Sequence, residues 1–174
     1  MHAFVDETKE KGLMVAATLT EVCHLQQARK TIQSKRLPGQ SRIHFKQERD
    51  SRRREICSIL VTLPVQVIVY DASGIRNAVE ARTSCLTAVV EDLAGIGGRR
   101  LTIEQDDSLV QSDRRTLYNA VRKFEVNEDF NYEHKRPNQE PLLWVSDAVA
   151  WCFAKGGEWR LRVKPLIKEV RKLS

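Results

Sequence analysis

Alternation between strand-like and helix-like segments in the middle of the chain constrains the fold more than any other feature of this sequence. Residues 65–71 are rich in β-branched side chains and predict a strand. Apolar positions within 79–93 recur at helical spacing, and a glycine-rich stop precedes a second predicted strand at 101–105. Strands separated by helices of this length pair in parallel within at least part of one sheet. We therefore expect an α/β fold.

The first third of the chain predicts an antiparallel hairpin instead of a crossover. Residues 2–6 and 13–19 form two apolar strands that are joined by a polar turn. A helix with one apolar face follows over 25–34, and residues 42–45 suit a short edge strand. A further helix begins at position 50 or 51 and ends before Pro64.

The last third predicts two more helices after a less regular stretch. A helix is expected to begin at Ser108 or Ser112 and to continue through Val121, and residues 126–134 form a loop or an edge strand. An apolar helix runs over 141–156, and an amphipathic tail helix is expected over 159–170. Because the chain has no internal repeat and no low-complexity linker, we expect a single domain spanning 1–174.

Composition limits the class of protein and its partners. The formal net charge is +6, which favours a polyanionic partner such as nucleic acid, although each small basic group also suits a solvated helix face. No apolar stretch approaches membrane-spanning length, and no signal-peptide pattern opens the chain, so we expect a soluble, cytoplasmic protein with no membrane partner. The cysteines lack metal-binding spacing and are interpreted as buried thiols of a reducing compartment; they are Cys23, Cys57, Cys85 and Cys152.

One carboxylate interrupts the most apolar predicted helix. Asp147 has Leu143, Trp144, Ala150 and Trp151 as neighbours at spacings of three and four residues. An ionised aspartate in such surroundings is costly to bury unless a cation or a hydrogen-bond donor compensates it. A metal ion is one candidate for that compensation.

Further acidic residues follow the predicted strands. Asp6 ends the first strand, Asp71 ends the strand at 65–71, and Glu104 with two aspartates ends the strand at 101–105. The carboxyl ends of parallel strands meet at one edge of an open α/β sheet, where ligands bind. Clustered carboxylates repel one another unless divalent cations lie between them, and Mg²⁺ or Mn²⁺ is the natural occupant.

Each acid also has a structural explanation that involves no metal. Aspartate after a strand is a common turn former, and Glu48 could simply lead the helix that follows it. His44 and His134 could contact phosphate or move a proton, but a packed or surface histidine is the more common case. Asp147 is the residue that a turn or an exposed cap does not explain.

Five short motifs follow one another along the chain: F-V-D-E-T at 4–8, H-F-K-Q-E at 44–48, V-I-V-Y-D at 67–71, I-E at 103–104 and L-L-W-V-S-D-A at 142–148. In this order they resemble a large uncharacterised bacterial family with a ribonuclease H-like fold, and the resemblance covers nearly the whole chain. The family typically opens with F-hydrophobic-D-E-S and closes with a helix that carries L-Q-x-A-D. This chain departs from it in having Thr8 in place of serine, Trp-Val-Ser before the last aspartate, and an added helix at 25–34.

The resemblance implies a mixed sheet that begins with an antiparallel hairpin, continues with parallel strands and is flanked by helices. It also implies that Asp6, Asp71 and Asp147 ligate a metal ion. Glu48 would be a fourth ligand or a neighbour of the site. Glu104 competes with Asp71 for the middle position, because its strand end is close in such a sheet.

These observations favour a nuclease, or a related enzyme that processes phosphodiester bonds, with Mg²⁺ or Mn²⁺ held by carboxylates and water as the nucleophile. The residues expected to carry the reaction are Asp6, Glu48, Asp71, Glu104 and Asp147. One alternative is a catalytically silent module with the same fold that binds nucleic acid or protein. Another is a structural role for Asp147, in which it bonds to a buried histidine, an arginine or a backbone amide.

Overall fold

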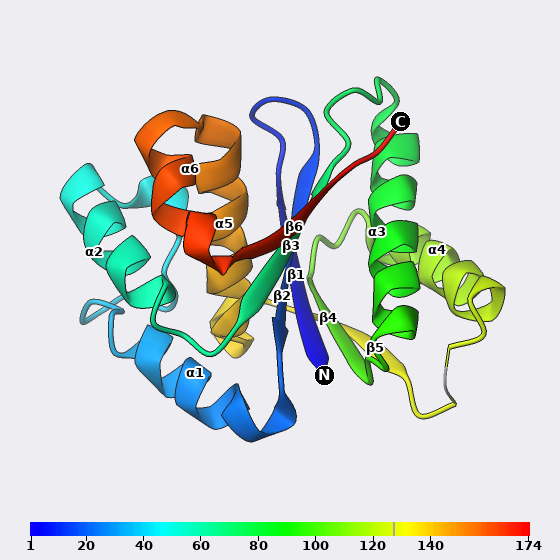
Figure 1. Ribbon diagram of the computed structural model, residues 1–174, viewed down its shortest axis with the longest axis horizontal. Coiled ribbons are helices and arrows are strands. Elements are labelled where there is room, and N and C mark those ends of the chain that lie inside the picture. The colour runs from blue at the N-terminus through cyan, green and yellow to red at the C-terminus, as the bar shows by residue number, and fades with distance from the viewer. Residues whose placement is uncertain (127) are drawn as a thin grey trace.

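A six-stranded mixed sheet forms the centre of the protein, as seen in a computed structural model that describes residues 1–126 and 128–174 (Figure 1). The order across the sheet is β5-β4-β1-β2-β3-β6. The strands are β1 (His2–Thr8), β2 (Met14–Thr20), β3 (Gln66–Asp71), β4 (Arg100–Glu104), β5 (Asn131–Lys135) and β6 (Ile167–Lys172).

Helices cover both faces of the sheet. Figure 1 shows α1, α2, α5 and α6 on one face and α3 and α4 on the other. Short 3-10 turns lie at Val22–His24, Phe45–Gln47, Pro137–Gln139 and Lys164–Leu166. The α-helices are α1 (Leu25–Gln33), α2 (Asp50–Leu60), α3 (Ala78–Gly95), α4 (Val110–Lys123), α5 (Leu142–Lys155) and α6 (Gly157–Val163).

Strand directions confirm the expected mixed sheet. The strands β1, β2 and β3 form an antiparallel meander, which begins with the predicted hairpin. On one side β4 pairs in parallel with β1, and β5 pairs in parallel with β4. On the other side β6 runs parallel to β3. The carboxyl ends of β1 and β4 therefore lie next to each other.

Alternation along β1 decides which face each acid reaches. Phe4 packs in the core beneath α5, whereas Val5 packs in the core beneath α3. Because side chains alternate along a strand, Asp6 shares the α5 face with Phe4, and Glu7 shares the α3 face with Val5. Two neighbouring acids are thus sent to opposite faces of the sheet.

Helix α5 is buried along nearly its whole length and packs on β1 and β2. Ser146 accounts for one polar position in it, since its Oγ donates a hydrogen bond to the carbonyl oxygen of Phe4 at 2.7 Å. The same Oγ lies 2.7 Å from Oγ1 of Thr18. Gly156, at φ 75°, ends the helix in a conformation that favours glycine. These contacts hold the next residue, Asp147, against the sheet.

The predicted tail helix is wrong in its second half. Helix α6 stops at Val163, Pro165 lies in the following 3-10 turn, and the chain then forms the strand β6. Val170 pairs with Val69, so hydrogen bonding to the free edge of β3 outweighs the helical spacing of the apolar residues. The sheet gains an edge strand that local patterning does not reveal.

Three smaller expectations also need correction or restriction. Residues 42–45 are not an edge strand; Ile43 and Phe45 are buried, and a 3-10 turn starts at Phe45. The stretch expected as a loop or edge strand over 126–134 contains β5 only from residue 131, and its position 127 lies outside the described residues. Cys23 is exposed, while the other cysteines are buried.

No helix within the described parts of the chain combines the length and the apolar character needed to cross a membrane.

Candidate active site

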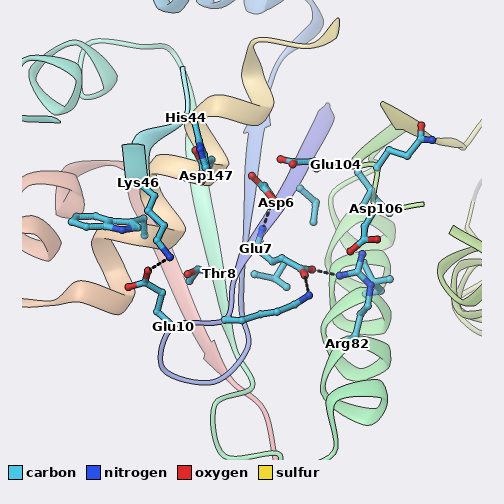
Figure 2. A pocket seen from close by; sticks show the side chains of 17 residues that line it. Asp6, Glu7, Thr8, Glu10, His44, Lys46, Arg82, Glu104, Asp106 and Asp147 are labelled. Carbon is cyan, nitrogen blue, oxygen red and sulfur yellow. Dashed lines mark hydrogen bonds and ion pairs between the residues drawn. The ribbon is translucent and has the colours of Figure 1, made fainter. Parts of the chain in front are cut away.

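A pocket of about 470 Å³ opens where β1 and β4 end beside α5. Asp6 of β1, Glu104 of β4 and Asp147 of α5 all line it (Figure 2). These three acids are far apart in the sequence, and the parallel pairing of β1 with β4 is what brings the first two together. Three of the five acids expected to form a site therefore share one cavity.

Asp6 has the strongest electrostatic perturbation in this pocket. Burial, the contact with the Glu104 carboxyl and the negative charge of Asp147 raise the pKa of Asp6 well above its ordinary value of 3.8. The backbone N–H of Glu7 donates to Oδ1 of Asp6 at 2.7 Å and acts in the opposite direction. The Asp6 carboxyl thus stands beside two other acids, Glu104 and Asp147.

Asp147 is oriented by a backbone amide. Its Oδ2 accepts a hydrogen bond from the N–H of Phe45 at 3.0 Å. Burial raises the pKa of Asp147, and the Phe45 amide and His44 oppose that rise. The carboxyl is partly exposed to the pocket even though its helix is buried. Part of the compensation that this residue needs therefore comes from the segment between α1 and α2.

Glu104 is the last residue of β4 and is half-buried. Nη1 of Arg42 lies 3.6 Å from its Oε1, which places one cation beside this acid. The sequence left Glu104 and Asp71 as alternatives for the position next to Asp6. In the structure, Glu104 lies there.

Asp71 and Glu48 lie elsewhere. Asp71 is on β3, and β2 separates β3 from β1; its Oδ1 accepts from the backbone N–H of Ser73 at 3.0 Å, which is a turn interaction. Glu48 is buried and accepts from Nε2 of Gln40 at 3.0 Å, with Arg52 nearby. Neither side chain lines the pocket.

His44 and Lys46 line the pocket on the side of α5. Figure 2 shows the His44 ring next to Asp147. The buried Nδ1 of His44 has no hydrogen-bond partner among the described residues. Lys46 forms an ion pair with Glu10, with 2.8 Å between Nζ and Oε1. Basic and acidic side chains therefore lie next to each other on this wall of the pocket.

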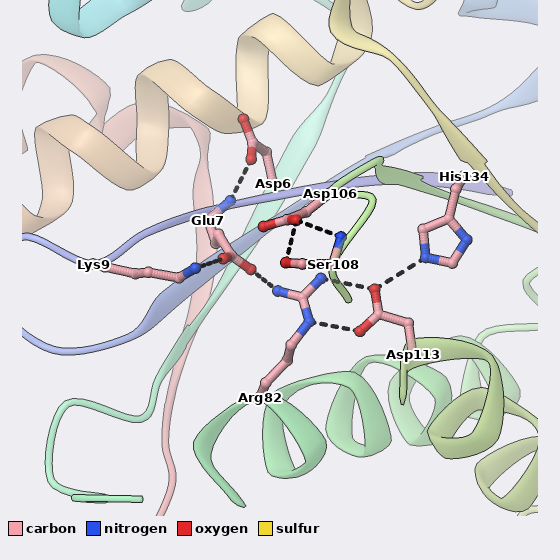
Figure 3. Close-up of polar contacts among 8 residues, drawn as sticks. All are labelled: Asp6, Glu7, Lys9, Arg82, Asp106, Ser108, Asp113 and His134. Carbon is pink, nitrogen blue, oxygen red and sulfur yellow. Dashed lines mark hydrogen bonds and ion pairs between the residues drawn. The ribbon is translucent and has the colours of Figure 1, made fainter. Parts of the chain in front are cut away.

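A buried ion-pair network supports the other face of β1 (Figure 3). Nε and Nη2 of Arg82 donate to the two carboxyl oxygens of Asp113 at 2.6 and 2.8 Å, and Nη1 donates to Glu7. Nε2 of His134 lies 3.0 Å from Asp113 Oδ2. The network ties α3, α4 and β5 to the residue that follows Asp6.

Sequence reasoning missed Arg82 and Asp113, although a signal for Arg82 exists. Arg82 occupies the same helical stripe as Leu86 and Val89, at spacings of four and seven residues. A charged side chain on an apolar stripe requires a buried partner, as Asp147 does on α5. Nothing local identifies that partner, because Asp113 lies on a different helix.

The pocket carboxylates suit a hard divalent cation by their chemistry. Carboxylate oxygens are the ligands that Mg²⁺ prefers, and Mg²⁺ commonly keeps several waters while using only one or two protein carboxylates. Within the described residues, no group of three or more His, Cys, Asp or Glu side chains has the geometry of a metal site. The residues present therefore fit a partly hydrated ion better than a fully protein-ligated one.

Comparison with known proteins supports the fold. No protein-family model matches the sequence, and no curated protein matches it. The chain is similar to a chain in the solved PCNA:RNase HII complex from Archaeoglobus fulgidus, with a TM-score of 0.59 and 16% identity over 94% of this chain and 76% of that one. At this identity the likeness is one of fold alone, and that fold is ribonuclease H-like.

Proposed function

We propose that this protein hydrolyses phosphodiester bonds of nucleic acid with the help of a partly hydrated Mg²⁺ or Mn²⁺ bound in the pocket that Asp6, Glu104 and Asp147 line. The observation that carries the proposal is the convergence of these three carboxyl groups on one pocket at the carboxyl ends of β1 and β4. Open α/β sheets bind their ligands at this edge. An uncompensated acidic cluster there costs stability, so a role with a cation explains why it exists.

The chain's own residues have separate tasks in this proposal. A bound divalent cation supplies charge neutralisation for the phosphate and a more acidic water. The backbone N–H of Phe45 donates to Oδ2 of Asp147 and orients it, and Arg42 pairs with Oε1 of Glu104. The His44 ring lies beside Asp147 on the pocket wall, where it can contact a phosphate of the substrate.

Two further observations concern the substrate. The similar archaeal chain belongs to a complex whose name includes RNase HII, a nuclease. The net charge of +6 also favours a polyanion. Together they support nucleic acid as the substrate class.

Cleavage assays with the full chain test this proposal. Labelled single-stranded, duplex, hybrid and branched nucleic acids are incubated with Mg²⁺ or Mn²⁺. We expect cleavage that Asp6→Asn, Glu104→Gln and Asp147→Asn each reduce by roughly a hundredfold or more, in line with the loss of a major electrostatic contribution.

Asp71→Asn is the matched control, because Asp71 also follows a strand but does not line the pocket. Its activity should equal that of the unsubstituted protein. If folded protein cleaves none of these substrates with either metal, the catalytic proposal fails.

A second candidate function is a catalytically silent module that binds nucleic acid. Two observations favour it: Asp147 already has a backbone amide partner, and no ready three-ligand metal group occurs among the described residues. Such a module would bind nucleic acid in a salt-sensitive manner, and Asp6→Asn and Asp147→Asn would leave the affinity unchanged.

A further inference from the structure

The acidic pocket continues into two further hollows on the α3 side of the sheet. It shares Glu7, Lys9 and Arg82 with a second pocket of about 300 Å³, which is lined by the β1–β2 turn and by the segment that precedes α3. The second pocket shares Val79 and Ser112 with a third one of about 580 Å³ between α3 and α4. The three hollows therefore lie next to one another in a row that leads away from the acids.

We call the third hollow the α3–α4 groove. Its polar lining comes from two helices that present hydroxyl, amide and basic side chains to solvent, and no Asp or Glu of the described chain lines it. The defining residues are Thr83 and Thr87 of α3 and Arg115, Thr116, Asn119 and Lys123 of α4. The path thus changes from acidic at the pocket to basic and neutral in the groove.

Three cations along this path are not used for ion pairs with other described residues. Arg76 in the second pocket and Arg115 and Lys123 in the groove form no salt bridge within 4.0 Å in the described part of the chain. Arginines elsewhere commonly do, as in the pairs of Arg29 with Glu140 and of Arg171 with Glu91. Cations without an ion-pair partner that are spaced along a groove are suited to phosphate groups.

Hydroxyl and amide groups in the groove are free as well. The hydrogen bonds found among the described residues include none from the side chains of Thr83, Thr87, Thr116 or Asn119. Elsewhere a helical hydroxyl does bond internally, since Ser58 donates to the carbonyl of Arg54 at 2.9 Å. Such free groups commonly contact phosphate and sugar oxygens in nucleic-acid complexes.

A docked apolar helix is a poorer occupant of this groove. Val79 and Ala120 are its only apolar lining residues among those described, and Ala120 is itself buried. An amphipathic helix requires a broad apolar stripe in its receiving groove. Most of the exposed groove surface is carbon, from Val79 and from the aliphatic parts of the polar side chains, so it is the unpaired cations that favour a polyanionic chain.

We propose that a single strand of nucleic acid runs from the acidic pocket past the β1–β2 turn and lies in the α3–α4 groove, with Arg76, Arg115 and Lys123 contacting its phosphates. This inference rests on the proposed function, since it identifies where that substrate continues beyond the reacting bond. It also assigns the polar faces of α3 and α4 to positioning of the substrate.

The test measures binding without catalysis. A fluorescent single-stranded oligonucleotide of about 20 nucleotides, long enough to extend beyond the pocket, is titrated with the full chain in the absence of divalent metal and at several salt concentrations. We expect the double substitution Arg115→Ala and Lys123→Ala to weaken binding. It should also make the negative slope of log K (the association constant) against log salt concentration shallower by ~1.4, because each phosphate of a single strand that the protein neutralises contributes ~0.7 to its magnitude.

Lys164→Ala combined with Lys168→Ala is the matched control. Both lysines are exposed, and neither forms an ion pair among the described residues. They lie near α6 and β6, and β6 is the edge strand at the end of the sheet opposite β5. This variant removes the same charge, so its salt slope should not change. Equal losses in the two variants would show non-specific attraction and would overturn the assignment of the groove.

The outcomes separate this inference from the proposed function. Groove-dependent binding without any cleavage would leave the strand path standing and would refute the enzyme. Cleavage and binding that are both indifferent to the groove variant would refute the path and leave the enzyme. Competition by a polyglutamate peptide at equal charge and concentration would overturn the assignment of the groove to nucleic acid.

Discussion

The hydroxyl of Ser146 in α5 donates a hydrogen bond of 2.7 Å to the backbone carbonyl oxygen of Phe4 in β1, and both residues are buried. Phe4 is two residues before Asp6, and Ser146 directly precedes Asp147. This hydrogen bond therefore joins the segment that carries Asp6 to the segment that carries Asp147.

Ser146→Ala should destabilise the protein and displace Asp147. The substitution removes a donor to Phe4 and a partner of Thr18, both of them buried, and an unsatisfied buried polar group costs ~1–3 kcal/mol. Urea denaturation measures the loss. Ser58→Ala, at an exposed hydroxyl on α2, is the control and should change the free energy of unfolding much less. Equal stability of the two variants would contradict this account.

Asp113→Asn should destabilise the protein by ~3 kcal/mol at neutral pH, because it leaves the buried charge of Arg82 without its main partner. Burial alone would raise the pKa of Asp113, but Arg82 and His134 outweigh it and hold that pKa below its ordinary value of 3.8. A depressed native pKa means that the stabilisation is complete above 3.8 and is lost as the pH falls through the native value.

The pH profile of the free energy of unfolding checks this sign. The difference between the unsubstituted protein and Asp113→Asn should be largest near neutral pH and shrink as the pH falls below 3.8. Asp107→Asn removes the exposed pair with Arg136 and should have no measurable effect. A difference that grows on acidification would show that the assigned direction is wrong.

Mn²⁺ should raise the thermal unfolding midpoint if the pocket binds it, because a ligand that binds only the native state stabilises that state, by ~2.7 kcal/mol at a hundred times its dissociation constant. The shift should disappear in Asp6→Asn and persist in Asp71→Asn. Burial, the contact with the Glu104 carboxyl and the charge of Asp147 raise the pKa of Asp6. Protonated Asp6 therefore stabilises the native state, and that stabilisation is lost as the pH rises through the native pKa of Asp6.

The Mn²⁺-induced shift should consequently grow with pH, since fewer Asp6 carboxyls then hold a proton that the cation must displace. An identical shift in Asp6→Asn and in the unsubstituted protein would place the ion elsewhere. Calcium is an informative comparison and should give a smaller shift, because it prefers six to eight oxygen ligands in a flexible shell.

Only Cys23 should react rapidly with a water-soluble disulfide reagent in the native protein. Cys23 is exposed, whereas Cys57, Cys85 and Cys152 are buried, and burial raises the pKa of Cys85 to about 12. Thiol titration before and after unfolding measures this difference. Cys23→Ser should abolish the fast reaction, and any fast reaction that remains would mean that a buried cysteine becomes exposed.

Much of the core fold can be predicted from local patterns. The alternation of strand and helix at 65–105 and the opening hairpin both follow from the period of the apolar residues. Asp6 and Asp147 are also recognisable, because one is an acid that follows apolar strand residues and the other interrupts an apolar helix. In such cases the responsible interactions act between residues that are close in the sequence.

The rest depends on contacts between distant segments. Residues 167–172 keep a helical apolar spacing, yet they pair with β3, which lies far earlier in the sequence. Glu104 and Asp71 follow strands of similar appearance, and only the order of strands in the sheet puts Glu104 beside β1 and Asp71 beyond β2. Local sequence does not encode that order.

Asp6 lies on a strand that is hydrogen-bonded to β2 on one side and to β4 on the other. Amide protons around it should therefore exchange with solvent only when the sheet opens as a whole, while those of the outer strands β5 and β6 exchange through smaller openings. The carboxyl groups of β1 and β4 then form a rigid base for any ligand. Adjustment to that ligand falls to the irregular segment that carries His44 and Lys46, which approaches from outside the sheet.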